Sequence, residues 1–142
     1  MSYRPSFFIA IVLTAIVIGL ILERNLHPTQ TTQYREVAVQ YGLQKQKETP
    51  PRQFYFDGCT LFPDQIGSTS FLSACLNHDI AYWYGGTVAE RKAADQTFRH
   101  EIANSGQFGT WLQWPMYGAV RLFGDTFVLR PFNANWGFGY NE

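Results

Sequence analysis

The sequence predicts a mainly α-helical protein whose small domain is built on two antiparallel helices. Residues 70–83 contain neither Gly nor Pro and are followed by Gly85-Gly86, a pair typical of a helix end. A second helix is predicted over residues 87–104, because Thr87 and Glu90 have the spacing of a capping box. A connection of two or three residues between helices of this length makes them antiparallel neighbours.

Length and composition favour one folded domain. The chain has 142 residues, of which 46% are hydrophobic and 15% are charged, and its formal net charge is zero. This apolar composition argues against intrinsic disorder, and the zero net charge gives no electrostatic basis for binding nucleic acid. Aromatic residues make up 17% of the chain, which indicates either an aromatic core or aromatic side chains that face something other than water.

The N-terminal region carries an uncharged apolar segment, residues 6–22, with Arg4 before it and Glu23 and Arg24 after it. Seventeen residues in a helix span roughly 25 Å, enough to cross a bilayer. We expect an uncleaved signal anchor; a cleaved signal peptide is the alternative, but no small-residue cleavage site follows the segment. Arg4 then places residues 1–5 in the cytoplasm and the rest of the chain on the periplasmic or extracytoplasmic side.

A polar stem, residues 23–53, is expected between the anchor and a domain at residues 54–142. Pro50-Pro51 ends any helix in the stem. Four apolar residues in it have helical spacing and predict one short helix: Tyr34, Val37, Ala38 and Tyr41.

The segment after residue 106 mixes glycines with aromatic residues. A short helix is expected at about residues 110–123, followed by a loop or a small hairpin. Within that helix, Trp111 and Trp114 are expected in the core, and a position at a lipid interface is the alternative.

The two cysteines, Cys59 and Cys75, lie in the part of the chain expected to be exported. Two thiols in an oxidising compartment most simply form one disulfide. Two buried free thiols are the alternative.

A buried His–Asp pair is expected between the two helices. His78 shares a helix face with Cys75 and Tyr82. Asp95 lies in a largely apolar stripe of the second helix, which also carries Arg91, Phe98 and Ile102. A carboxylate in such a stripe needs a partner, and His78 is the natural one across the antiparallel interface. A histidine held by a buried aspartate is suited to act as a general base.

Asp79 is rotated by about a quarter turn from His78 and so faces a different neighbour. Its carboxylate is suited to bind calcium if backbone carbonyls of a nearby loop complete the oxygen ligands. Residues 57–64 form such a loop, and a bridge between Cys59 and Cys75 would hold it beside the helix.

These residues resemble the secreted phospholipase A2 superfamily, and most closely a group of small bacterial phospholipase A2-like proteins. The family's Cys-x-x-His-Asp followed by Tyr corresponds to Cys75, His78, Asp79 and Tyr82. The aspartate that orients the histidine corresponds to Asp95, and the calcium-loop cysteine that bridges to the helix corresponds to Cys59.

The resemblance implies calcium-dependent hydrolysis of the sn-2 ester of phospholipids, with a phospholipid bilayer as the partner. His78 would deprotonate a water molecule, Asp95 would orient His78, and Tyr82 would bind Asp95. Calcium would be held by Asp79 and by three loop carbonyls, those of Gly58, Thr60 and Phe62.

The loop departs from the family pattern. Leu61, Phe62 and Pro63 stand where vertebrate-type calcium loops are rich in glycine, so Asp57 or Asp64 is an alternative calcium ligand. Both aspartates are also typical turn formers.

Two alternative functions remain open. One is a non-catalytic, membrane-anchored module that binds lipid or a protein on the same scaffold. In this module His78 would be a core histidine that is hydrogen-bonded to Asp95 and takes part in no reaction. The other is a hydrolase of a different ester or acyl substrate that uses the same pair.

Overall fold

The computed structural model describes residues 29–60, 62–125 and 135–140. Four helices carry this part of the chain, and they follow one another as α2 (Thr29–Gln44), α3 (Leu72–Tyr84), α4 (Val88–Asn104) and α5 (Gln107–Phe123). A short hairpin, β1 (Gln65–Ile66) and β2 (Thr69–Ser70), precedes α3. The prediction of a mainly helical domain is confirmed.

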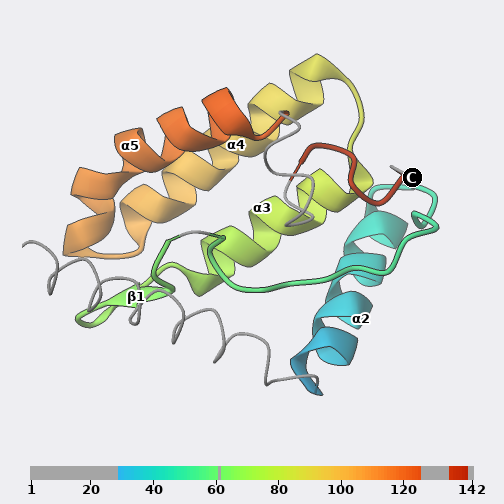
Figure 1. Ribbon diagram of the computed structural model, residues 1–142, viewed down its shortest axis with the longest axis horizontal. Helices are drawn as coiled ribbons and strands as arrows, with labels where there is room; N and C mark the ends of the chain where they lie inside the picture. Colours follow the sequence, from blue (N-terminus) through green and yellow to red (C-terminus); the bar gives the residue numbers. More distant parts are fainter. Residues whose placement is uncertain (1–28, 61, 126–134, 141–142) are drawn as a thin grey trace, which may run out of the picture.

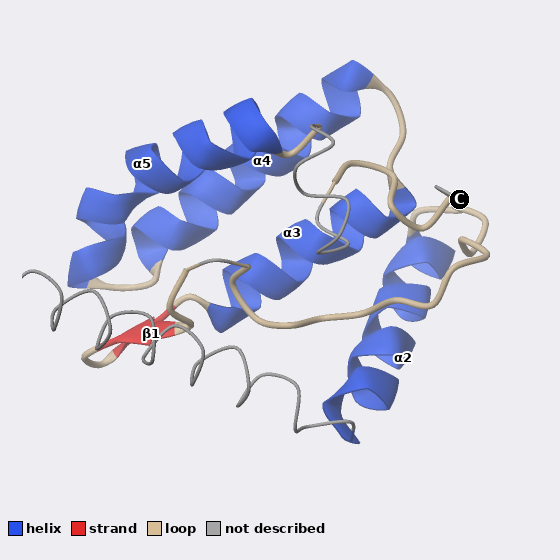
Figure 2. Cartoon of the chain, in the orientation of Figure 1, coloured by secondary structure: helices blue, strands red, loops and turns tan. Residues whose placement is uncertain are grey.

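α3 lies between α2 on one side and α4 and α5 on the other (Figure 1). α4 runs antiparallel to α3 and packs against both α3 and α5. α2 lies at the opposite side of α3, near its C-terminal end, and the hairpin lies near its start (Figure 2). The antiparallel pair that the sequence predicts is therefore α3 and α4.

Gly85 makes the tight exit from α3. Its φ of +61° is one that residues with a side chain rarely adopt, and a Cβ there would lie 2.6 Å from the Cα of Gly137. A glycine is thus required both by the backbone conformation and by the close approach of the C-terminal segment. The exit leaves three residues between the end of α3 and the start of α4.

The capping box at the start of α4 is confirmed. The Thr87 hydroxyl accepts a hydrogen bond from the Glu90 N–H (3.2 Å), and the Glu90 carboxylate accepts one from the Thr87 N–H (2.7 Å). These bonds with Thr87, helped by Lys47, lower the pKa of Glu90 to about 2. The cap therefore fixes where the helix that carries Asp95 begins.

The core is largely aromatic. The largest side chains that are almost completely buried include Trp83, Tyr82, Phe54, Phe71 and Phe138. The four residues of the α4 stripe are buried as well: Arg91, Asp95, Phe98 and Ile102. Part of the aromatic excess of the sequence is thus explained by the interior.

α2 belongs to the packed domain. Ala38 is fully buried, and its carbonyl accepts a hydrogen bond from the Tyr84 hydroxyl (3.2 Å), while the rings of Tyr34 and Phe56 meet edge to face at 4.8 Å. The helix spans Thr29–Gln44, so it is longer than the short helix expected in the stem, and packing begins well before residue 54.

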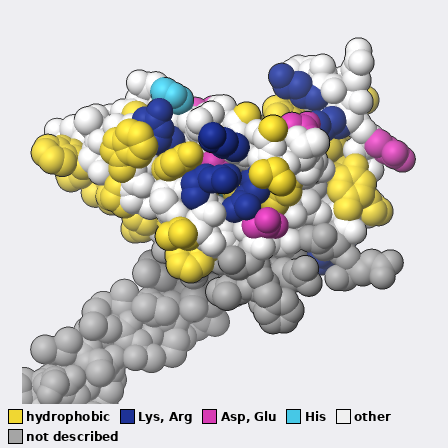
Figure 3. All heavy atoms as spheres, turned by 90° about the horizontal axis from the view of Figure 1, so that it is seen from above, with side chains coloured by type: hydrophobic (Ala, Val, Ile, Leu, Met, Phe, Trp, Pro, Cys, Tyr) yellow, Lys and Arg dark blue, Asp and Glu magenta, His cyan; other side chains and the backbone are white. Residues whose placement is uncertain are grey.

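α5 differs from its prediction in exposure. It begins three residues earlier than expected, and the side chains of Trp111 and Trp114 are 81% and 60% exposed. The expectation that both tryptophans lie in the core is wrong. Trp114 instead stacks under the guanidinium of Arg99, 4.4 Å from the ring centre. The face that carries α4 and α5 therefore shows hydrophobic side chains beside a group of basic ones (Figure 3).

Residues 135–140 close the C-terminal end of α3. The N–H groups of Gly137 and Gly139 donate to the carbonyls of Tyr82 and Trp83, at 2.7 and 3.1 Å. These bonds satisfy carbonyls that the end of the helix leaves open. The expected loop or hairpin after α5 lies mostly outside the described residues.

The expected cytoplasmic segment, residues 1–5, and the expected anchor, residues 6–22, also lie outside the described residues. Among the helices of the described part, none has the length and apolar character needed to cross a membrane.

The cap of α4 gives a first prediction. Thr87→Ala removes the hydroxyl that accepts the Glu90 N–H, and we expect the free energy of unfolding to fall by about 1 kcal/mol. Urea denaturation followed by circular dichroism measures the change. Thr97→Ala, on the exposed side of α4, is the matched control and should be neutral or slightly stabilising because Ala favours a helix. Equal effects of the two substitutions would contradict the role of the cap.

Candidate active site

A disulfide joins the loop before the hairpin to α3. Cys59 and Cys75 are bonded, with Cα atoms 5.2 Å apart, so the predicted disulfide is confirmed. The loop also holds itself together, because Asp64 accepts the N–H of Cys59 (2.7 Å) and Asp57 accepts the hydroxyl of Thr60 (3.1 Å). The loop is therefore fastened beside the helix that carries His78.

The structure brings His78 and Asp95 into contact across α3 and α4. Nε2 of His78 lies 2.9 Å from Oδ1 of Asp95, and the side chains are 8% and 0% exposed. An ionised carboxylate only accepts hydrogen bonds, so Nε2 carries the proton in this contact. Nδ1 is then the ring nitrogen with the lone pair in neutral His78.

Asp95 receives hydrogen bonds from two further side chains. The Tyr82 hydroxyl donates to Oδ1 (2.7 Å), as the sequence predicts, and the Arg121 guanidinium donates to Oδ2 (2.6 Å). Burial alone would raise the pKa of Asp95, but the hydrogen bonds from His78, Arg121 and Tyr82 outweigh it and hold that pKa below its usual value. Burial also raises the pKa of Tyr82, so its hydroxyl keeps its proton.

Aromatic packing fixes the orientation of the imidazole. The His78 ring centre lies 4.1 Å from that of Tyr82 and 4.5 Å from that of Phe98. Ring contacts at these distances, together with the bond to Asp95, leave the imidazole little freedom to rotate. The Nε2 edge of the His78 ring is thus held against Asp95, and the Nδ1 edge does not contact Asp95.

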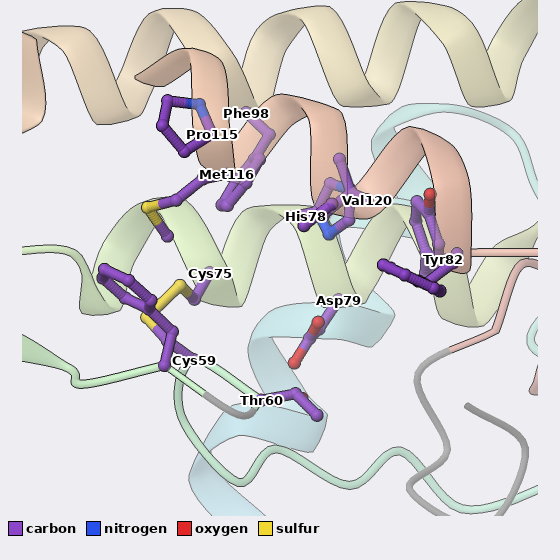
Figure 4. Close-up of a pocket in the computed structure, with 14 residues that line it drawn as sticks. Cys59, Thr60, Cys75, His78, Asp79, Tyr82, Phe98, Pro115, Met116 and Val120 are labelled. Carbon is purple, nitrogen blue, oxygen red and sulfur yellow. A yellow bond between two sulfur atoms is a disulfide. The ribbon is translucent and has the colours of Figure 1, made fainter. Parts of the chain in front are cut away.

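A pocket of about 570 Å³ opens beside His78 (Figure 4). Its polar lining comes from Thr60, His78, Asp79 and Tyr82. The remaining walls are mostly apolar and come from the disulfide loop, α3, α4 and α5: Cys59, Phe62, Cys75, Phe98, Pro115, Met116, Ala119, Val120, Phe123 and Gly124. A histidine next to an apolar pocket of this size is suited to a ligand with a polar group and a hydrocarbon part.

Asp79 points toward the loop that carries Thr60 (Figure 4). It is half-buried, and Asp79, Thr60 and Phe62 all line the pocket. Gly58 is buried with a φ of +85°, and a Cβ there would collide with the Asp64 carboxylate. The structure therefore brings Asp79 to the predicted loop and turns Asp64 inward toward the backbone.

The Asp79 carboxylate is a ligand of the kind that calcium prefers, since calcium binds carboxylate and carbonyl oxygens. Asp57 and Asp64 both bond within the loop, which is the behaviour of turn formers. Across the described ranges, no group of three or more His, Cys, Asp or Glu side chains is placed to hold a metal. A calcium ion at Asp79 would therefore depend on backbone carbonyls, those of Gly58, Thr60 and Phe62 being the predicted ones.

Two arginines of the site were missed by sequence reasoning. Arg121 bonds to Asp95, and Arg91 is only 8% exposed. Arg91 donates to the carbonyls of Val120 and Arg121 and pairs with Asp125. The signal for Arg91 was its place on the same helical stripe as Asp95. No comparable signal existed for Arg121, which comes from a different helix.

Comparisons with known proteins give no further information on this site, because no protein-family model, curated protein or solved structure matches the chain.

The lowered pKa of Asp95 predicts a loss of stability in acid. Its contribution is complete above the ordinary pKa of an Asp side chain, about 3.9, and is lost as the pH falls through the lower pKa of the folded state. Asp95→Asn should therefore flatten the fall in unfolding free energy as the pH decreases below about 4. Urea denaturation at a series of pH values measures the slope.

Glu90→Gln serves as a comparison in the same experiment, because it removes another carboxyl whose pKa is lowered. Each substitution should reduce the dependence of the unfolding free energy on pH by the contribution of the carboxyl that it removes. A slope in Asp95→Asn equal to that of the unsubstituted protein would show that the contacts of Asp95 do not favour its ionised form.

Proposed function

We propose that the protein is a phospholipase A2-like hydrolase that cleaves the sn-2 ester of phospholipids with the help of calcium. The observation that carries the proposal is the 2.9 Å contact between His78 and the fully buried Asp95, beside an apolar pocket that also contains Asp79. The resemblance of Cys75, His78, Asp79 and Tyr82 to the phospholipase A2 pattern supports the same conclusion.

His78 acts as the general base. Its Nδ1 accepts a proton from a water molecule, whose oxygen forms a bond to the carbonyl carbon of the ester. The bond from that carbon to the alkoxy oxygen then breaks, and His78 returns the proton to the leaving oxygen. The products are a fatty acid and a lysophospholipid.

Asp95 supports both stages of this reaction. Its contact with Nε2 fixes the tautomer in which Nδ1 can accept a proton, and its charge stabilises the imidazolium that forms. Tyr82 and Arg121 hold the carboxylate in place through its two oxygens. His78 therefore receives a proton without having to move.

The apolar walls receive the acyl chain. Phe62 from the loop and Met116 and Val120 from α5 line the same pocket as His78. Burying hydrocarbon against such walls is favourable at about 25 cal/mol per Å². The ester group is then drawn to the polar side of the pocket, where His78 and Asp79 lie.

Calcium would be held by the Asp79 carboxylate and by the carbonyls of Gly58, Thr60 and Phe62. When bound there, it would polarise the ester carbonyl and stabilise the negative charge that develops on its oxygen. The disulfide between Cys59 and Cys75 supports this role, because it keeps the loop beside Asp79.

The bilayer is both the substrate and the partner. Residues 6–22 anchor the protein, residues 1–5 remain in the cytoplasm, and the domain acts on the periplasmic or extracytoplasmic side. The bonded cysteines support an oxidising compartment.

A non-catalytic lipid- or protein-binding module is the second candidate. The observation that favours it is the exposure of large apolar side chains on α5, among them Trp111 (81%), Trp114 (60%) and Leu122 (70%). Such a surface would bind its partner whether or not His78 takes part in a reaction.

Substitution of the general base separates the two candidates. His78→Gln should lower the release of fatty acid from phosphatidylcholine vesicles by about 10²–10⁴-fold, because Gln cannot accept the proton. His100→Gln, an exposed histidine on α4, is the matched control and should retain activity. Unchanged fatty-acid release in His78→Gln would exclude His78 as the general base, and a parent protein that releases no fatty acid would leave the binding module.

The calcium site can be tested without an activity assay. Isothermal titration of the purified protein with CaCl₂ should show binding, with a dissociation constant of about 0.1–1 mM if the site resembles other extracellular calcium modules. Asp79→Asn should abolish this binding and also the hydrolysis of vesicles, whereas Glu36→Gln on the exposed face of α2 should change neither. Calcium binding that persists in Asp79→Asn, or hydrolysis that survives chelation, would contradict the assignment.

A further inference from the structure

Three helices meet at the single carboxylate of Asp95. His78 and Tyr82 of α3 bind Oδ1, while Arg121 of α5 binds Oδ2 at 2.6 Å, and Asp95 itself lies on α4. Arg121 is thus the cation paired with a carboxylate that has no exposure to solvent. The donors on Oδ1 cannot replace Arg121, because they leave Oδ2 without a hydrogen-bond partner.

The same turn of α5 also forms part of the pocket wall. Val120 and Phe123, the neighbours of Arg121 in this turn, both line the pocket. The turn is held in place by Arg91, which donates to the carbonyls of Val120 (3.3 Å) and Arg121 (3.1 Å). The position of the wall and the position of the Asp95 carboxylate are therefore connected through one residue.

We propose that Arg121 is a positioning residue: its ion pair with Oδ2 of Asp95 orients the carboxylate that holds His78 and makes this orientation depend on the docking of α5. The role of Arg121 rests on the proposed function only where it concerns turnover. Its effect on the geometry of His78 and Asp95 does not depend on which reaction the protein performs.

Arg121→Met tests this role, with Arg99→Met as the matched control. Arg99 also connects α4 to α5, through Gln113 (2.9 Å) and Trp114, but it does not bind Asp95. Comparing the two substitutions separates the loss of the Asp95 contact from the loss of any arginine between these helices. Arg121→Gln is the milder variant and carries the test if Arg121→Met does not fold.

The first measurement is the proton NMR signal of Nε2–H of His78, assigned by its disappearance in His78→Gln. The strong hydrogen bond to Asp95 should place this signal downfield. We expect it to shift upfield or broaden in Arg121→Met and Arg121→Gln, to stay unchanged in Arg99→Met, and to return toward its original position in Arg121→Lys, which restores a charged donor.

The second measurement is turnover on phosphatidylcholine vesicles with calcium. A poorly oriented base should lower kcat by about 10–100-fold, the range seen when a residue that orients a metal-binding side chain is lost, while KM for the vesicle lipid changes little. Arg121→Lys should recover most of the lost kcat. A purely structural effect on the pocket wall would instead raise KM, and Arg121→Lys would not restore kcat selectively.

The outcomes are distinguishable. A folded Arg121→Met or Arg121→Gln with an unchanged His78 signal and unchanged kcat overturns the inference and leaves the proposed function intact. A parent protein that hydrolyses no lipid overturns the proposed function, and the NMR signal still decides whether Arg121 positions the pair. A loss confined to KM also overturns the inference.

Discussion

The buried carboxylate of Asp95 is the constraint on which the arrangement of the helices depends. A charge without solvent in a largely aromatic interior is tolerated only with full compensation, and here it comes from His78 and Tyr82 on α3 and from Arg121 on α5. Helices that slid or rotated relative to α4 would leave this charge without a partner. The same contacts that set the packing of α3, α4 and α5 therefore also set the geometry of the candidate site, so its preorganisation is a property of the fold and not of a local loop.

Local signals explain why part of this arrangement could be predicted from the sequence. α3 and α4 are bounded by glycines and by the Thr87–Glu90 cap, and helical spacing alone places His78 and Asp95 on faces that meet once the two helices are antiparallel. The pairing of the two cysteines followed from their number. Each of these predictions needs only short-range chemistry and one short connection, which is why the structure agrees with them at those points.

The remaining features could not be predicted, because they depend on how segments far apart in the sequence pack against one another. Arg121 lies on a helix that could have packed in several orientations, so no spacing rule connects it to Asp95. Trp111 and Trp114 have helical spacing typical of a core, but the neighbour that would cover them in such a core is absent from the described residues, and they remain exposed. The burial of Ala38 likewise depends on where α2 docks and not on its own sequence.

The disulfide has a consequence for when the site becomes complete. In a reducing compartment Cys59 and Cys75 would be separate thiols, and the loop next to Asp79 would be held to α3 without a covalent bond. Under the proposed export, oxidation is a step in assembling the candidate site as well as a source of stability. On that proposal, a newly made chain would leave the cytoplasm with this part of the site unfinished, and the disulfide would complete it in the oxidising compartment.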